Sequence, residues 1–265
     1  MMTISPSSSS SSPKRIFCYG DSLTAGTSPP LDQLFPYGSH LEQELNKLCM
    51  HSPSLSSTSS SSASESASDY EPEYAVVRWR GLPGWTASAM AEYMNDSTIG
   101  LKSALDGIRN PSLSLVIILA GTNDIGSITS SSMLGINKNI SDEDGENNKE
   151  YYVSMVVDPI VRLHQSCLDC VTDSGKKDLR TLAIGIPGSA WQEMNANAAR
   201  LCSDVNDALR QYASNSEGRV TYMDFPFHYR RGDNKWCADG LHLSPEGYET
   251  LGISVAPCVK ELLLL

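Results

Sequence analysis

A serine on a glycine-flanked turn and a histidine near the C-terminus are the most informative residues of this chain. Ser22 lies in the segment Gly20–Gly26, GDSLTAG, directly after a short apolar run. A serine hydroxyl is a poor nucleophile until a base removes its proton, so it needs a histidine within hydrogen-bond reach. His242 meets this need, and Asp239, three residues earlier, is spaced to hold one ring nitrogen while the other faces the serine. The three residues predict a catalytic triad.

Acyl transfer by a serine also needs donors for the oxyanion that forms on the substrate carbonyl. Gly84, in the sequence GLPGW, offers a backbone N–H that no side chain shields. Asn123, in the sequence GTND, offers a side-chain amide. Each of the two follows an apolar run, as Ser22 does. Gly84 and Asn123 are therefore the candidate oxyanion donors.

Elements that alternate between strand and helix must position these residues. The chain has five short, apolar, β-rich runs with helical patterns between them. Alternation of this kind predicts a parallel sheet covered on both faces, with its site at the carboxyl ends of the strands. The predicted strands are Arg15–Tyr19, Tyr74–Trp79, Leu113–Ala120, Leu179–Ile186 and Arg219–Phe225.

Helical periodicity and start signals place the helices between the strands. A serine or aspartate followed by proline is typical of a helix start, so Asp158-Pro159 and Ser244-Pro245 are predicted to begin two helices. Apolar residues at helical spacing mark three helices, over Leu34–Leu48, Ile160–Val171 and Leu201–Tyr212.

The blocks around the candidate residues resemble those of the SGNH hydrolase superfamily, also called GDSL esterases and lipases. The blocks extend from Gly20 to His242, nearly the whole predicted ordered chain. The resemblance implies a flavodoxin-like, three-layer α/β/α sandwich with about five parallel strands. Unlike many members, which carry a polar and an acidic residue beside the second-block glycine, this chain has Pro83 and Trp85 there. No Gly-x-Ser-x-Gly elbow surrounds Ser22, which argues against the α/β-hydrolase fold.

The resemblance also assigns roles to individual residues. It implies that Ser22 is the nucleophile and that its backbone N–H is a third oxyanion donor beside Gly84 and Asn123. It implies that Asp239 and His242 complete the triad. It implies no cofactor, and the chain shows no set of metal ligands: Cys167 and Cys170 have CxxC spacing but lie in a helical pattern without a second pair.

Composition limits the partners. The formal charge of −11 disfavours nucleic acids and anionic membranes, because phosphates and acidic lipids are repelled by it. No apolar run approaches the roughly 20 residues of a membrane span. Seven cysteines without a regular framework are expected to be reduced thiols, and the serine-rich N-terminus is no secretory signal, so we expect a cytoplasmic protein. The expected partner is a small, neutral or cationic ester; the oligomeric state stays open.

The domain organisation is predicted to be simple. We expect residues 1–13 to be a disordered serine-rich N-terminus and residues 14–265 to form a single hydrolase domain. This domain is expected to carry a serine-rich loop at 52–68 and an acidic insertion at 127–150. Since the insertion directly follows the Asn123 block, it is expected to lie beside the crevice as a lid or specificity loop.

Two functional classes are open at this point. The first is a serine esterase that hydrolyses small carboxylic esters, with short-chain acyl, aryl or acetyl groups, through an acyl-enzyme on Ser22. The second is an acyltransferase that passes the same acyl group to an alcohol instead of water. A binding module with an inactive site is disfavoured, because every catalytic position of the family is filled.

Overall fold

The computed structural model describes residues 12–50, 74–107, 113–133, 145–170 and 179–265. The strands of these residues form a five-stranded, entirely parallel sheet in the order β2-β1-β3-β4-β5. The strands are β1 (Lys14–Gly20), β2 (Ala75–Gly81), β3 (Leu115–Leu119), β4 (Arg180–Ile184) and β5 (Val220–Met223). This order is that of the flavodoxin-like doubly wound folds, so the predicted fold class is confirmed.

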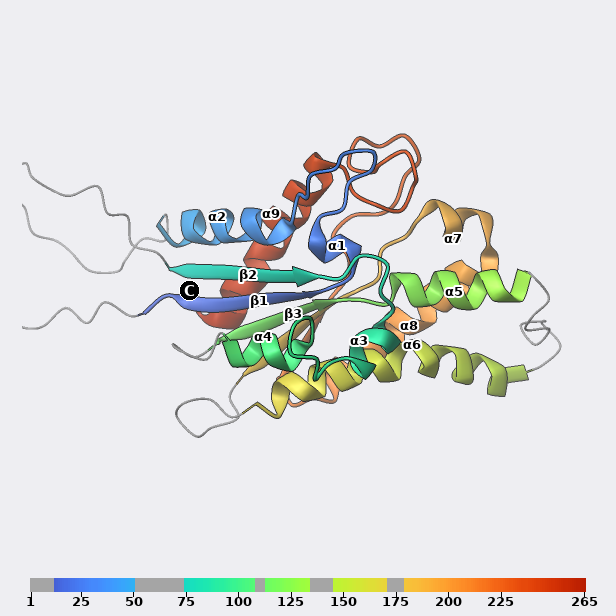
Figure 1. The fold of residues 1–265 in the computed structure, drawn as a ribbon, viewed down its shortest axis with the longest axis horizontal. Helices are drawn as coiled ribbons and strands as arrows, with labels where there is room; N and C mark the ends of the chain where they lie inside the picture. Colours follow the sequence, from blue (N-terminus) through green and yellow to red (C-terminus); the bar gives the residue numbers. More distant parts are fainter. Residues whose placement is uncertain (1–11, 51–73, 108–112, 134–144, 171–178) are drawn as a thin grey trace, which may run out of the picture.

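Helices cover both faces of the sheet (Figure 1). Helices α2 and α9 pack together on one face, and α3, α4, α6 and α8 lie on the other, which gives three layers. Short helices α1, α5 and α7 lie toward the end of the sheet where the strands terminate. The helices are α1 (Ser22–Ala25), α2 (Tyr37–Met50), α3 (Ala87–Glu92), α4 (Leu101–Gly107), α5 (Thr122–Met133), α6 (Gly145–Leu168), α7 (Ala190–Met194), α8 (Ala196–Ser214) and α9 (Pro245–Leu263).

The central strands are apolar because both of their faces are buried. Every residue of β3, with the sequence LVIIL, is buried, and alternate side chains enter the two core layers. In β1 the buried run extends from Ile16 to Gly20. Continuous apolar runs, rather than alternating ones, are what a parallel sheet covered by crossover helices requires.

The strand order reverses beside β1, and this places the site. The chain passes from β1 to β2 on one side and then returns to β3 on the other side of β1. Connections that diverge in this way leave a crevice at the carboxyl ends of the strands. Ser22 follows β1, Gly84 follows β2 and Asn123 follows β3, so all three lie at this end of the sheet.

Two side chains of α2 bind the free edge of β2. The Asn46 Oδ1 atom accepts the N–H groups of Tyr74 and Ala75 at 2.8 and 3.0 Å, and its Nδ2 donates to the Ala75 carbonyl at 3.0 Å. The Glu42 carboxylate accepts the N–H of Val77. Polar groups on an edge strand would otherwise be open to pairing with another chain, so α2 both holds and shields this edge.

One predicted helix start is confirmed and the other is wrong. Ser244 caps α9 by accepting the Gly247 N–H at 3.1 Å, with Pro245 at the first helical position. Pro159, in contrast, lies inside α6. Buried residues before and after this proline, Val156 and Ile160 among them, share one apolar cluster, so tertiary packing outweighs the lost helical hydrogen bond.

Two further expectations need correction. Leu34 is 58% exposed and lies before α2, which begins at Tyr37, so it is not part of the helical face. The segment 127–150 is helical at both ends, since α5 runs to Met133 and α6 begins at Gly145. The first end stays helical because Ile125 and Ile128 are buried. The rest of the expected insertion lies outside the described residues, as do residues 1–11 and the serine-rich loop at 52–68.

Candidate active site

The turn after β1 holds Ser22 in a closely packed position. Asp21 caps α1, where its carboxylate accepts the Leu23 N–H at 2.9 Å. A Cβ at Gly20 would lie 2.0 Å from the Leu119 carbonyl oxygen, so only glycine lets β1 run this close to the end of β3. As the first residue of α1, Ser22 has a backbone N–H without an intrahelical partner, and the residue as a whole is buried, with 6% of its surface exposed.

Ser22, His242 and Asp239 form a continuous chain of hydrogen bonds. The Ser22 Oγ atom lies 3.0 Å from His242 Nε2, although 220 residues separate the two in sequence. On the other side of the ring, His242 Nδ1 lies 2.7 Å from Asp239 Oδ2. These are the distances that proton transfer from a serine to an oriented imidazole requires.

Backbone contacts fix the loop that carries His242. The His242 carbonyl accepts the Cys237 N–H at 2.8 Å, and Trp236 and Leu243 form an antiparallel bridge. Gly240 has a φ of 66°, in the left-handed region, and its carbonyl accepts the Ala190 N–H at 2.8 Å. The loop is therefore held both within itself and against the start of α7.

Asp239 is held in its ionised form by its own loop. Its Oδ1 atom accepts the backbone N–H groups of Leu241 and His242, each at 3.0 Å. Partial burial acts to raise the pKa of Asp239, but the hydrogen bonds from the His242 ring and from these two N–H groups outweigh it and hold the pKa below its usual value. An ionised carboxylate here favours the Nδ1–H tautomer of His242.

The turn after β2 presents the Gly84 N–H. The Trp85 N–H bonds the Leu82 carbonyl at 3.1 Å, and Gly84 has a φ of 78°. Proline at the second position and a glycine with positive φ at the third are typical of a type II turn, so Pro83 and Gly84 form this turn together. Nothing lies within 4 Å of a Cβ built on Gly84. None of the described residues accepts a hydrogen bond from the N–H of Ser22 or of Gly84.

Asn123 joins the segments that follow β2 and β3. It lies in the first turn of α5, and its Nδ2 donates to the Trp85 carbonyl at 2.9 Å. A primary amide carries two N–H groups, so the second N–H remains available to another acceptor. The bond to Trp85 orients this amide next to the turn that contains Gly84.

Two buried carboxylates beside these residues were not singled out from the sequence. Asp124 is 4% exposed and accepts the N–H groups of Ala87 and Ser88 at 2.7 and 3.3 Å. Burial raises its pKa, against the effect of these bonds. Burial likewise raises the pKa of Asp21 to about 7, and its Oδ2 atom has no hydrogen-bond partner among the described residues. The only signal in the sequence was their place next to Ser22 and Asn123.

Three tryptophans, Trp85, Trp191 and Trp236, differ in their surroundings. Trp236 is 7% exposed and packs in the core against Phe225, Phe227 and Tyr229, so it is not a substrate contact. Trp85 is half-buried, with its ring edge-on to Tyr93. Trp191, on α7, is half-buried and donates from Nε1 to the Thr129 hydroxyl at 2.8 Å.

Comparison with known proteins shows the family of this chain. The model of the GDSL-like Lipase/Acylhydrolase family matches residues 18–250, from the end of β1 to the middle of α9. The chain belongs to this family. As a GDSL-like hydrolase it is an enzyme that cleaves carboxylic esters. A search of curated proteins found no match.

Solved structures similar to this GDSL-like hydrolase share its fold at low identity. An aryl esterase of M. smegmatis is 20% identical, with 94% of this chain and 100% of that chain covered, at a TM-score of 0.58. A carbohydrate acetylesterase from Sinorhizobium meliloti is 17% identical, with 94% and 99% covered, at 0.55. A lipase from a goat rumen metagenome is 14% identical, with 92% and 96% covered, at 0.61.

Within the described part of the hydrolase, no group of three or more His, Cys, Asp or Glu side chains is placed to hold a metal ion. No helix of this part is long and apolar enough to cross a bilayer. None of the seven cysteines, all of which lie in the described residues, forms a disulfide, and Cys167 is buried in the core.

Proposed function

We propose that this chain hydrolyses small carboxylic esters through an acyl-enzyme on Ser22, with His242 as general base and Asp239 as the residue that orients it. The observation that carries the proposal is the hydrogen-bond chain from Ser22 Oγ through His242 to Asp239, at 3.0 and 2.7 Å. Two further observations support these roles: Asp239 orients the His242 ring, and the lowered pKa of Asp239 favours its ionised form.

The first half-reaction acylates the serine. As Ser22 Oγ attacks the ester carbonyl carbon, its proton passes to His242 Nε2, and the Nδ1–H remains bonded to Asp239. The carbonyl oxygen gains a negative charge in the tetrahedral intermediate. We place the N–H groups of Ser22 and Gly84 and the second amide N–H of Asn123 around this oxygen, since none of the described residues takes them.

Collapse of this intermediate completes the acylation: His242 Nε2–H protonates the leaving alcohol oxygen as the C–O bond breaks, which leaves the acyl group on Ser22. The second half-reaction releases the acid. A water molecule then gives a proton to the same Nε2 and attacks the acyl carbonyl. The second tetrahedral intermediate collapses, the proton returns to Ser22 Oγ, and the carboxylic acid leaves.

Water access favours hydrolysis over acyl transfer to an alcohol. The side chains of His242 and Asp239 are 16% and 35% exposed, so the deacylating base lies at the surface rather than in a dry channel. Measuring how the acyl group divides between water and added alcohol decides between the two reactions. Transfer as the main product at low alcohol concentration would make the chain an acyltransferase.

We expect the substrates to be short-chain acyl, aryl or acetyl esters. We expect the reaction to need no metal or cofactor. The similar solved structures include an aryl esterase and a carbohydrate acetylesterase, which supports a short acyl group. A panel of p-nitrophenyl esters of rising chain length tests this preference. We expect the highest kcat/KM at acetate to butyrate and unchanged activity in EDTA.

Replacing the nucleophile tests the mechanism itself. Ser22→Ala is expected to fold but to lose about four or more orders of magnitude of kcat, because removal of a triad nucleophile leaves only binding and oxyanion stabilisation. It should also fail to react with a fluorophosphonate probe. Ser214→Ala, at the exposed end of α8, is the matched control and should keep full activity. Retention of a tenth of kcat in Ser22→Ala would disprove the assignment.

A further inference from the structure

The turn that carries the Gly84 N–H is held at its two ends rather than at its tip. Pro83 and Gly84 are exposed, and a Cβ built on Gly84 would meet nothing within 4 Å. The one hydrogen bond inside the turn joins the Trp85 N–H to the Leu82 carbonyl at 3.1 Å. The direction of the Gly84 N–H therefore depends on what holds the chain before and after the tip.

The first anchor ties the start of the turn to the segment of the nucleophile. The Leu82 N–H donates to the Gly20 carbonyl at 2.8 Å, two residues before Ser22. A Cβ on Gly81 would lie 2.0 Å from the Ala25 nitrogen, so the end of β2 also lies directly against α1. These contacts fix the start of the turn relative to Ser22.

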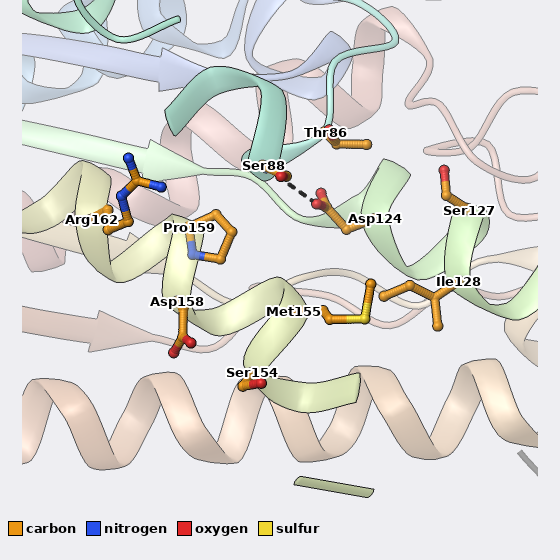
Figure 2. Close-up of a pocket in the computed structure, with 10 residues that line it drawn as sticks. All are labelled: Thr86, Ser88, Asp124, Ser127, Ile128, Ser154, Met155, Asp158, Pro159 and Arg162. Carbon is orange, nitrogen blue, oxygen red and sulfur yellow. Dashed lines mark hydrogen bonds between the residues drawn. The ribbon is translucent and has the colours of Figure 1, made fainter. Parts of the chain in front are cut away.

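The second anchor comes from the first turn of α5. Asn123 Nδ2 donates to the Trp85 carbonyl at 2.9 Å, directly after the tip. Asp124, the next residue of α5, accepts the N–H groups of Ala87 and Ser88 at 2.7 and 3.3 Å, one with each oxygen. Figure 2 shows the Asp124 carboxylate directed at the start of α3. Two consecutive residues of α5 thus hold the far end of the turn.

A carboxylate is the group that suits the position of Asp124. The residue is 4% exposed, and a buried charge is costly unless hydrogen bonds compensate it. Two backbone donors need two acceptors, and a carboxylate supplies both, whereas the isosteric amide supplies one. Because each oxygen bonds the backbone of α3, Asp124 is placed to hold this segment and not to contact a substrate.

We infer that Asp124 is a positioning residue for the oxyanion donors: it fixes the turn that carries the Gly84 N–H against α5, which carries Asn123. Donors that are in place before the charge develops stabilise the transition state without reorganising. Loss of the anchor should therefore weaken oxyanion stabilisation and leave substrate binding in the ground state unchanged. This inference rests on the proposed esterase function.

Asp124→Asn tests the anchor, because asparagine keeps the volume but turns an NH2 group toward one of the two backbone N–H groups. We expect kcat per active site, counted by titration to completion with a fluorophosphonate, to fall about ten- to a hundredfold. The KM for p-nitrophenyl acetate should change little. The inhibition constant of phenylboronic acid, which forms a tetrahedral adduct with a serine nucleophile, should rise by a similar factor.

Asp96→Ala is the matched control, because it also removes a carboxylate that bonds two backbone N–H groups. Asp96 accepts the N–H groups of Thr98 and Ile99 at 2.8 and 3.0 Å, in the segment between α3 and α4. This variant should keep the wild-type kcat per titrated site and the wild-type inhibition constant. A purely structural role of Asp124 predicts the same pattern for Asp124→Asn, with fewer titratable sites only, and this result would overturn the inference.

A second variant removes a donor of the same anchor, should Asp124→Asn yield no folded protein. Ser88 is exposed in the first turn of α3, where proline is tolerated, so Ser88→Pro deletes one N–H that Asp124 binds. A fall in kcat per site and a rise in the inhibition constant are expected again, and wild-type values would refute the anchor.

The anchor and the proposed function can fail separately. If Ser22→Ala keeps its activity, the esterase mechanism fails, and hydrogen exchange then tests the anchor alone. Amides of residues 82–89 should exchange faster in Asp124→Asn, or in Ser88→Pro, than in the wild type, while those of residues 75–81 in β2 stay unchanged. Equal exchange of residues 82–89 in variant and wild type would refute the positioning role.

Discussion

We expect the amide of Asn123 to have two tasks, one for each of its N–H groups. One N–H holds the Trp85 carbonyl, and we expect the other to stabilise the oxyanion. An oxyanion donor acts on the transition state more than on the substrate. Asn123→Ala should therefore lower kcat by roughly 10² to 10³, about 2.7 to 4 kcal/mol, with little change in KM. Kinetics and denaturant unfolding on one preparation measure both tasks. A normal kcat with a lowered unfolding midpoint would leave Asn123 a purely structural role.

Asp21 should make stability depend on pH in an unusual direction. Burial raises its folded pKa from 3.8 to about 7, and the carboxylates and phenols that face it are Asp124, Tyr37 and Tyr248. Because the folded state keeps a proton that the unfolded state has released, this group's stabilisation is complete below about pH 4 and is lost as pH rises to about 7.

Asp21→Asn tests this dependence, because asparagine keeps an oxygen for the Leu23 N–H and removes the titration. Between pH 4 and 7 the free energy of unfolding of the variant should rise relative to wild type by roughly 1.4 kcal/mol per pH unit. Subtracting the free energy of unfolding of the wild type from that of the variant at each pH removes the contribution of all other titrating groups. Equal pH dependence in both would show that Asp21 is ionised throughout. Asp239→Asn should show the opposite sign and only below about pH 4, because the lowered pKa of Asp239 stabilises the wild type as pH rises to its usual value of 3.8.

The sequence could predict the residues of the site better than their surroundings. Ser22, His242 and Asp239 were predicted from chemistry and order, and the structure brings them together. The burial of Asp21 and Asp124 was not predictable, because it depends on neighbours from other elements. Whether these residues act as assigned is what the variants test.

At the scale of elements, the contact of α2 with β2 is a structural feature that catalysis does not use. Asn46 makes three hydrogen bonds to the backbone of Tyr74 and Ala75. Asn46→Ala should lower the free energy of unfolding by about 1 to 3 kcal/mol, since backbone groups lose their partners. The kcat should stay at the wild-type value, which makes this variant the stability control for Asn123→Ala. A fall in kcat equal to that of Asn123→Ala would show that edge packing, rather than a lost donor, controls activity.

The position of Pro159 shows where local signals fail. Aspartate followed by proline is a good start for a helix, yet α6 passes through this pair. The start signal measures local preference, whereas burial of Val156, Ile160 and Leu163 on either side of the proline is a property of the assembled core. At Ser244-Pro245 the same signal agrees with packing, and there the prediction is confirmed. Local and tertiary preferences must coincide for a sequence pattern to be decisive.

At the scale of the molecule, the parallel sheet followed from the alternation of apolar runs and helical patterns. The strand order did not follow from this alternation, because periodicity says nothing about which side of β1 each later strand occupies. The order was implied by the family resemblance alone. This order is what brings the ends of β1, β2 and β3 together. The triad also needs the loop before α9, which returns to the same end of the sheet.

The overall charge should govern which esters reach this site. The chain carries 31 acidic and 20 basic side chains, a net charge of −11, and the carboxylate of Asp239 is joined to the nucleophile through His242. A negative field slows the approach of anionic substrates, and salt screens it over a Debye length of about 30 Å at 0.01 M and about 8 Å at 0.15 M. Raising ionic strength over this range should increase kcat/KM for p-nitrophenyl hemisuccinate, which is anionic, and leave that for neutral p-nitrophenyl acetate unchanged. The two esters share a leaving group, so their ratio isolates the charge of the acyl part. A ratio that does not move with salt would mean that groups close to the nucleophile, rather than the charge of the whole molecule, set the preference.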